Sequence, residues 1–291
     1  MEDTSQLADW IRTACRLEVL APKPGNVHPD ARFDDLTADD FLRSADIVAP
    51  ILARARQDGF SQVILAAVEA TQQALGRNTN LGIILLLAPL AAVPLDRPLT
   101  TGIADVLGNT TVADSALVYR AIRRALPGGM GRSDEQDLAD EPTLPLVDVM
   151  QLAAERDLIA AQYVNNFRDV LGFGVTELVR WTERCPLIAT AIIGLHLSLM
   201  SKLPDTLIAR KCGAQVAHES ATRATAVLDA GWPESAAGRT ACDELDLWLR
   251  ADGHRRNPGT TADLIAATLF AAQRDHNWSP DTPFDKGKNR R

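Results

Sequence analysis

Apolar residues recur at helical spacing along most of the chain, and strand-like alternation is hardly present. Leu7, Ile11 and Ala14, for example, share one face of a helix whose other faces are polar. The sequence therefore predicts an all-α protein. The expected helices cover residues 4–20, 39–56, 62–75, 81–92, 101–107, 112–125, 146–171, 174–183, 186–200, 204–211, 214–229, 233–251 and 260–275.

Neither a repeat nor a composition change divides this series of helices. We therefore expect a single large multi-helix globular domain over residues 1–278, followed by a polar tail, 279–291, expected to be disordered. Several helix starts carry capping signals. Thr37 is followed three residues later by Asp40, and Thr79 or Asn80 precedes the apolar run that begins at Leu81. Residues 128–145 show little pattern and predict a lid or binding loop.

Composition excludes several classes of protein. The 291 residues carry 30 basic and 38 acidic side chains, a net charge of −8, with no basic stripe outside the tail, so nucleic-acid binding is not expected. From its first residues we expect no secretory signal, and the apolar stretch 81–95 is too short to span a membrane. Four scattered cysteines indicate neither disulfides nor a zinc site. We expect a cytoplasmic protein, and its apolar helices suit a homodimer as well as a monomer.

Three short loops, 22–28, 78–82 and 257–263, hold much of the polar chemistry. Each joins turn formers to amide, hydroxyl or charged side chains just before a helical run, where free backbone N–H groups attract phosphate. Lys23 is one of only five lysines and stands between two prolines, which suits an anionic ligand. The alternative is that Pro22–Gly25 is a plain exposed turn.

Candidate ligand-binding residues come mainly from these loops. The simpler alternatives are a helix cap for Asp263 and a turn residue for His28, while His196 reads as a core histidine. The binding candidates are Lys23, Gly25, Asn26, His28, Asn78, Thr79, Asn80, Tyr163, Arg210, Gly259, Thr260, Thr261 and Asp263.

Acids near the loops indicate carboxylate chemistry with Mg²⁺. Glu18 ends the first predicted helix, and Asp157 and Asp205 lie on or beside later ones. Mg²⁺ is commonly held by one or two carboxylates together with substrate phosphates, so scattered acids are sufficient. Glu18 and Asp205 are the candidate metal ligands, and each acid has a cap or a surface ion pair as its alternative role.

Five polar segments follow one another along the chain: Glu18 with Pro22–Val27, Asn78–Gly82, Glu155–Asp157 with Gln162-Tyr163, Asp205-Thr206 and Pro258–Leu264. In this order they resemble the triphosphoribosyl-dephospho-CoA synthase family. The resemblance runs from about residue 7 to residue 272. It implies an all-α enzyme that joins C1 of the ribose of ATP to the 2′-hydroxyl of 3′-dephospho-CoA and releases adenine. The product is the precursor of the prosthetic group on acyl carrier subunits.

This reaction develops positive charge at the anomeric carbon, which a nearby carboxylate stabilises, and it requires a base for the acceptor hydroxyl. Glu18, Asp205 and Asp157 are the catalytic candidates, and the sequence does not choose the base among them. Lys23, Arg210, Mg²⁺ and the amides after Thr79 and Thr260 are expected to hold the triphosphate.

The chain departs from the family pattern in the second loop. Typical members read Asn-Thr-His-Lys-Gly where this sequence has Asn78-Thr79-Asn80-Leu81-Gly82, so a proton donor and a phosphate-binding cation are replaced. A subgroup with this loop resembles proteins that accompany tetrahydromethanopterin-linked one-carbon genes. Two alternatives therefore stand beside triphosphoribosyl transfer: a related nucleotide-dependent transferase or ligase in one-carbon cofactor biosynthesis, and a non-catalytic nucleotide-binding protein.

Overall fold

The computed structural model describes residues 2–33, 36–77, 79–125, 136–276 and 278–280. These residues form helices and no strand; a single isolated bridge joins His28 and Ala31. The expectation of an all-α, multi-helix globular protein is confirmed. No helix in the described ranges is long and apolar enough to cross a membrane.

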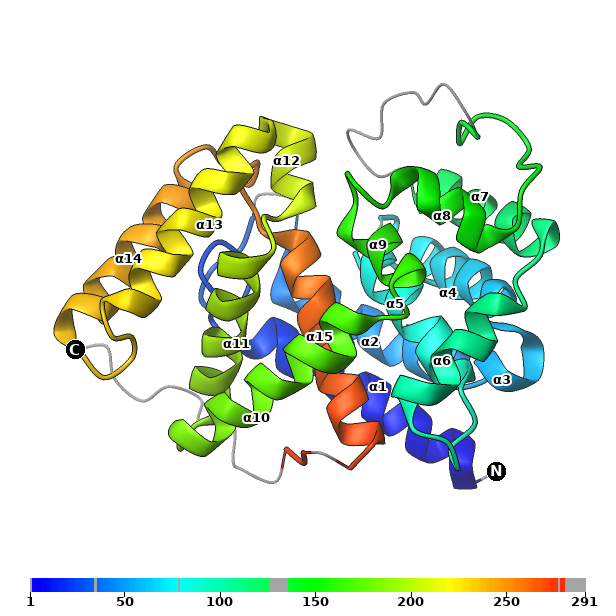
Figure 1. Cartoon of the computed structure of the whole chain (residues 1–291), viewed down its shortest axis with the longest axis horizontal. Helices are drawn as coiled ribbons and strands as arrows, with labels where there is room; N and C mark the ends of the chain where they lie inside the picture. Colours follow the sequence, from blue (N-terminus) through cyan, green and yellow to red (C-terminus); the bar gives the residue numbers. More distant parts are fainter. Residues whose placement is uncertain (1, 34–35, 78, 126–135, 277, 281–291) are drawn as a thin grey trace.

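Helix α15 (Gly259–Arg274) runs through the middle of the molecule (Figure 1). It is apolar on almost every face, and Ile265, Leu269 and Phe270 are fully buried. A helix that is hydrophobic all round is satisfied only in a core. Its direct neighbours include α1 (Glu2–Leu20), α5 (Leu81–Ala92) and α11 (Ile188–Lys202).

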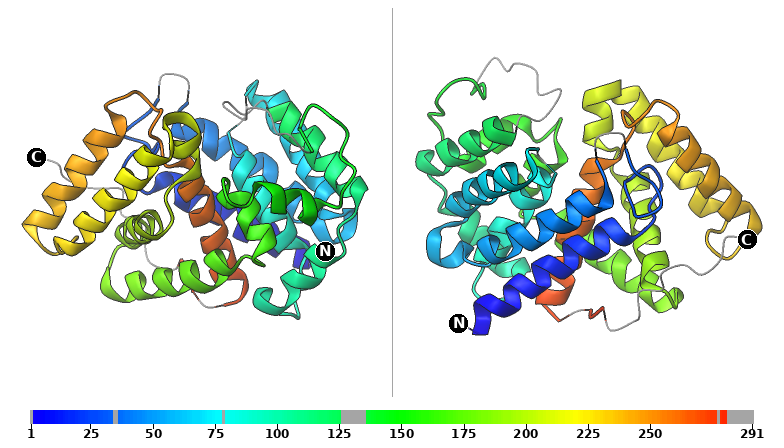
Figure 2. Two further views of the ribbon diagram at one scale, coloured as in Figure 1. Left: turned by 45° about the horizontal axis from the view of Figure 1, so that its top comes forward. Right: turned by 180° about the vertical axis from the view of Figure 1, so that it is seen from behind.

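The other helices form two groups on either side of α15 (Figures 1 and 2). One group comprises α2 (Ala38–Leu52), α3 (Ala55–Asp58), α4 (Phe60–Leu75), α6 (Leu99–Gly108), α7 (Val112–Ala125), α8 (Leu146–Ala153) and α9 (Leu158–Val164). The other comprises α10 (Val175–Arg184), α12 (Thr206–Cys212), α13 (Ala214–Asp229) and α14 (Ala236–Arg250), and the π-helical turn η1 (Asp169–Gly174) leads into it.

The long helix expected over residues 146–171 is wrong. The chain leaves the helix after Ala153 and starts again at Leu158, because Asp157 takes an extended conformation and caps α9 with its side chain. A second break follows α9, where Asn166 and Phe167 adopt positive φ before η1. The helix expected over 39–56 likewise ends at Leu52, and α3 follows as a separate turn.

The capping predictions have mixed outcomes. Thr37 and Asp40 form the expected capping box at the start of α2. Asn80 precedes α5 without capping it; its side-chain amide donates instead to Ser44 Oγ at 3.0 Å. His196 is fully buried in α11, with Nε2 3.1 Å from the Pro24 carbonyl oxygen, so its interpretation as a core histidine is confirmed.

Candidate active site

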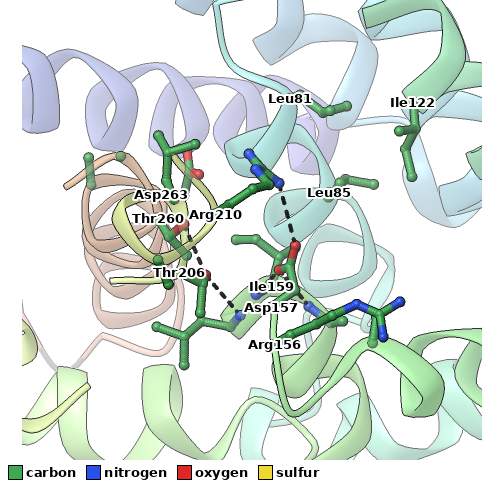
Figure 3. A pocket seen from close by; sticks show the side chains of 18 of the residues that line it. Leu81, Leu85, Ile122, Arg156, Asp157, Ile159, Thr206, Arg210, Thr260 and Asp263 are labelled. Atoms are coloured by element: carbon green, nitrogen blue, oxygen red, sulfur yellow. Dashed lines mark hydrogen bonds and ion pairs between the residues drawn. The ribbon is translucent and has the colours of Figure 1, made fainter. Parts of the chain in front are cut away.

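A cavity of about 1050 Å³ opens at the N-terminal end of α15. Side chains from α1, α2, α5, α7, α8, α9, α12, α13 and α15 line it, so both groups of helices contribute. Figure 3 shows part of this lining. Its size lies at the upper end of the range for pockets that bind small molecules. Eight of the candidates line it: Glu18, Asn26, Thr79, Asp157, Arg210, Gly259, Thr260 and Asp263.

A carboxylate and a guanidinium group from two different helices approach each other in the cavity. Oδ2 of Asp157, before α9, lies 3.9 Å from Nη1 of Arg210 in the last turn of α12 (Figure 3). Asp157 Oδ1 accepts from the backbone N–H groups of Ile159 at 2.8 Å and Ala160 at 3.3 Å. The cap thus fixes the carboxylate and leaves Oδ2 directed toward Arg210.

Hydroxyl groups connect three helix starts beside this pair. Thr206 Oγ1 donates to Thr260 Oγ1 at 3.2 Å and accepts from the Leu158 backbone N–H at 3.2 Å (Figure 3). The N-terminal ends of α9, α12 and α15 therefore converge on one wall. Carboxylates already accept from all three helix starts, because Asp157 caps α9 and Asp205 accepts from the first N–H groups of α12 and from Thr261 of α15.

Asp205 does not line the cavity, although it was a candidate catalyst and metal ligand. It is fully buried and caps α12: Oδ1 accepts from Leu207 N–H at 2.8 Å and Ile208 N–H at 3.0 Å. Oδ2 accepts from Thr261 N–H at 2.7 Å and Thr261 Oγ1 at 2.9 Å. Burial raises the pKa of Asp205, and these hydrogen bonds oppose the rise. The geometry therefore supports a structural role for both Asp205 and Thr261.

Lys23 also lies outside the cavity, with an exposed fraction of 0%. Its Nζ is 2.9 Å from Glu18 Oε1, and it also donates to the backbone carbonyls of Glu18 and Ala21. An ammonium group has three protons, and these partners use them all. A direct contact of Lys23 with phosphate is thus not supported by its position. The lysine instead fixes Glu18, which does line the cavity.

The first loop is tied to α14 and to the third loop. Gly25 has a φ of +77°, and a Cβ there would lie 2.8–2.9 Å from Leu249 and Pro258 atoms, so glycine is required. Its N–H donates to Asp246 Oδ1 at 2.7 Å. Asn26 Nδ2 donates to Asn257 Oδ1 at 2.7 Å, and Asn26 reaches the cavity wall. Gly25 thus permits the backbone conformation of the loop, and Asn26 lines the cavity.

Three other candidates lie elsewhere. His28 borders a separate hollow of about 400 Å³, and burial, followed by Arg250 and Lys23, lowers its pKa to about 4. Tyr163 is buried, and its hydroxyl donates to the Leu85 carbonyl at 2.6 Å. Asn80 is buried behind the cavity wall. Asn78 lies outside the described residues.

Asp263, on α15, lines the cavity without any hydrogen-bond or ion-pair partner in the described part of the chain. It is not a helix cap, because α15 already begins at Gly259 after Pro258. Its carboxylate lies against Gly82 in the first turn of α5, where a Cβ would stand 2.0 Å from Oδ2. Burial raises the pKa of Asp263 well above its usual value, and the charges of Glu18, Asp205 and Asp157 add to the rise.

The sequence did not single out several charged side chains that line the cavity. Arg156 follows Glu155 in the quoted motif, and Lys211 follows Arg210, so their positions next to candidates were an available signal. His218 on α13 carried no such signal. Residues 136–138, within the predicted lid, also line the cavity, whereas 128–135 lie outside the described residues.

The sequence offered Glu18 and Asp205 as magnesium ligands, and the structure adds Asp157 as an acid whose position suits a metal ion. In the described ranges, no three His, Cys, Asp or Glu side chains are grouped to hold a metal ion. Asp205 has all its acceptor capacity engaged, so it does not fit. Asp157 fits better, because its Oδ2 reaches the cavity and accepts no backbone hydrogen bond. Carboxylates of this kind hold Mg²⁺ together with phosphate oxygens.

Fold and site together define an all-α protein with a cavity suited to a charged, nucleotide-sized ligand. A family model for ATP:dephospho-CoA triphosphoribosyl transferase matches residues 4–282. The chain belongs to this family.

Curated relatives resemble part of the chain. A protein from Pseudomonas savastanoi pv. phaseolicola, provisionally named 2-(5''-triphosphoribosyl)-3'-dephosphocoenzyme-A synthase, is 40% identical over 109 residues, 38% of this chain and 37% of the relative. A Stutzerimonas stutzeri protein with the same provisional name is 42% identical over 112 residues, 38% of this chain and 37% of the relative. The aligned part thus spans little more than a third of these relatives.

A solved structure resembles most of the fold. It is a crystal structure provisionally named triphosphoribosyl-dephospho-CoA synthase, from Archaeoglobus fulgidus, with a TM-score of 0.62 and 27% sequence identity. The match covers 80% of this chain and 98% of the other.

Proposed function

We propose that the protein transfers the triphosphoribosyl group of ATP to the 2′-hydroxyl of 3′-dephospho-CoA and releases adenine. The observation that carries this proposal is the family match over residues 4–282. The cavity supports it, because carboxylates and cations from several helices share one space large enough for a nucleotide.

In this proposal the triphosphate binds among the cationic side chains that line the cavity. Arg210 and Lys211 end α12, and Arg156 precedes α9 on the facing side. Thr260, with Gly259 at the start of α15, adds a helix N-terminus and a hydroxyl group. Arginine gives directional, charge-assisted bonds to phosphate oxygens, and the helix end contributes backbone donors. Arg210 thus keeps the phosphate-binding role that the sequence suggested for it and for Lys23, whereas Lys23 does not line the cavity.

Glu18 stabilises the positive charge that develops on the ribose as adenine departs. Its carboxylate lines the cavity while Lys23 holds Oε1 at 2.9 Å. The ion pair fixes the orientation of the carboxylate, and a pre-oriented charge is the arrangement required for electrostatic stabilisation of a transition state. Mg²⁺, when bound through Asp157 and phosphate oxygens, supplies neutralisation of the triphosphate charge.

The test is to incubate the purified protein with ATP, Mg²⁺ and 3′-dephospho-CoA and to follow free adenine and the coupled product by mass spectrometry. We expect both to form together, and neither when dephospho-CoA is omitted. Intact ATP at high enzyme concentration would contradict the proposal. ATP binding without turnover on any acceptor would indicate a non-catalytic nucleotide-binding protein.

One observation favours a second candidate, a related nucleotide-dependent transferase or ligase with another acceptor in one-carbon cofactor biosynthesis. Leu81, at the position of the lysine in typical members of the family, lines the cavity beside Leu85 and Ile122 (Figure 3). An apolar wall binds no phosphate and suits an acceptor with an apolar part. Deletion of the gene would then abolish the one-carbon cofactor and leave acyl carrier modification intact.

We also propose that the protein is cytoplasmic and that it forms a homodimer. All four cysteines are unpaired, as expected in a reducing compartment. Cell fractionation tests the first, and sedimentation analysis of the purified protein tests the second.

A further inference from the structure

Asp263 differs from Glu18 and Asp157, the other two candidate acids that line the cavity, in having no partner. Glu18 is paired with Lys23, and Asp157 caps α9 and faces Arg210. By contrast, no described residue donates a hydrogen bond to Asp263 or forms an ion pair with it. Asp263 is half-buried and lines the cavity, so its unpaired carboxylate is placed where a ligand can use it.

The position of Asp263 is nevertheless closely defined. It lies in the second turn of the buried central helix α15, and its carboxylate is in contact with Gly82 of α5. Both residues line the cavity (Figure 3 shows Asp263 beside Thr260). The absence of a Cβ at residue 82 creates the space that the carboxylate occupies. Two rigid helices therefore hold an unpaired acid at the ligand space, which is how catalytic groups are fixed.

We propose that Asp263 is the general base that accepts the proton of the acceptor hydroxyl. This inference rests on the proposed transfer reaction. The carboxylate takes the proton while the acceptor oxygen forms a bond to ribose C1, and the bond from C1 to adenine N9 breaks with its electron pair going to adenine. Adenine takes up a proton from solvent, and Asp263 returns its proton to solvent, so no net proton is gained or lost.

The groups that face Asp263 suit this role. From α1 they are Glu18 and Cys15; from the starts of α9 and α12 they are Asp157 and Asp205; the cation is Arg210. Burial is the largest cause of the raised pKa of Asp263, the three acids add to it, and Arg210 opposes it. A carboxylate with greater proton affinity is a stronger base near neutral pH than an ordinary aspartate.

The other acids suit the role less well. Asp205 accepts four hydrogen bonds and does not line the cavity. Oε1 of Glu18 is already engaged by Lys23 at 2.9 Å, so this carboxylate is partly occupied by a cation. Asp157 Oδ1 accepts two backbone hydrogen bonds, and its Oδ2 faces a cation.

The test compares Asp263→Asn with the wild type and with Asp148→Asn, an exposed acid of α8 outside the cavity. We expect Asp263→Asn to lower kcat for adenine release about 10²- to 10⁴-fold, the usual contribution of a general base. ATP affinity and the Mg²⁺ requirement should stay close to wild type, and the loss of activity at low pH that we expect of the wild type should be absent from the variant. Asp148→Asn should behave like the wild type.

Retained activity of Asp263→Asn with an unchanged pH profile would overturn the proposal, as would a raised Mg²⁺ requirement, which would make Asp263 a metal ligand. The melting temperature supplies a readout independent of turnover. An unpaired functional acid predicts a more stable Asn variant at pH 8, and a lowered melting temperature would indicate a structural role. If the wild type releases no adenine, the proposed function fails, and the melting temperature still decides whether Asp263 is an unpaired acid.

Discussion

Nζ of Lys23 lies 2.9 Å from Oε1 of Glu18, and both side chains are buried, with exposed fractions of 0% and 5%. Lys23, which the sequence predicts as a phosphate ligand, is thus positioned as an internal counterion for an acid at the cavity wall. A buried ion pair of this kind fixes geometry, because removal of either partner leaves an uncompensated charge.

Lys23→Met should lower the free energy of unfolding by about 3–5 kcal/mol, since Glu18 then remains buried without its cation. Urea denaturation measures the loss. The double variant Lys23→Met/Glu18→Gln should recover much of it, because no charge is left unpaired. If Lys23→Met keeps wild-type stability and only weakens ATP binding, the internal-counterion interpretation is wrong.

Asp205→Asn should destabilise the protein by about 1.5–3 kcal/mol, the usual worth of a hydrogen bond to a charged group. The amide cannot accept from both Thr261 N–H and the two α12 amides that the carboxylate serves. Asp252→Asn, in the exposed pair with Arg255, is the control and should change stability by less than about 1 kcal/mol. An Asp205→Asn variant of normal stability but without activity would instead favour a catalytic role.

Gly82→Ala should impair both stability and turnover. The new Cβ would stand 2.0 Å from Asp263 Oδ2, so the carboxylate must move, and overpacking of this kind costs about 1–3 kcal/mol. Gly108→Ala in α6 is the matched control, because nothing lies within 4 Å of its Cβ. Thermal denaturation and adenine release measure the two effects. Equal behaviour of the two alanine variants would contradict the close approach of Asp263.

Arg210→Gln should weaken ATP binding about 10- to 100-fold, because a charge-assisted phosphate contact is worth about 1.5–3 kcal/mol. The remaining affinity should depend less on salt. Isothermal titration calorimetry at two salt concentrations measures both effects. Arg223→Gln, in an exposed pair with Glu219 on α13, should bind ATP like the wild type. An unchanged affinity in Arg210→Gln would remove Arg210 from the triphosphate site.

Stability should respond to pH through Asp263 with a defined sign. Its pKa in the folded state is raised above the ordinary value of 3.8, so ionisation opposes folding. The favourable contribution of the protonated acid is complete below the unfolded pKa and is lost as pH rises through the folded pKa. Asp263→Asn should therefore melt higher than the wild type at pH 8, and the difference should shrink toward pH 4. A difference that grows toward acid pH would contradict the raised pKa.

The helices and the three polar loops were largely predictable from sequence, because both depend on short-range patterns. The capping box of Thr37 and Asp40 spans three residues, and the apolar run from Leu81 defines α5 by itself. The break at Asp157 escaped prediction because apolar spacing continues across it, while the cap depends on side-chain geometry.

The sequence by itself determined the all-helical class, the family and the loop segments that border the cavity. Tertiary structure alone decided the roles of the charged residues within those segments. Asp205 accepts a hydrogen bond from Thr261, 56 residues away. The carboxylate of Asp263 lies in the space that a side chain at Gly82 would occupy. Lys23 faces inward because Glu18 and two carbonyls surround its ammonium group. The role of a charge depends on which atoms surround it, and long-range packing sets those neighbours independently of the local pattern that forms each helix.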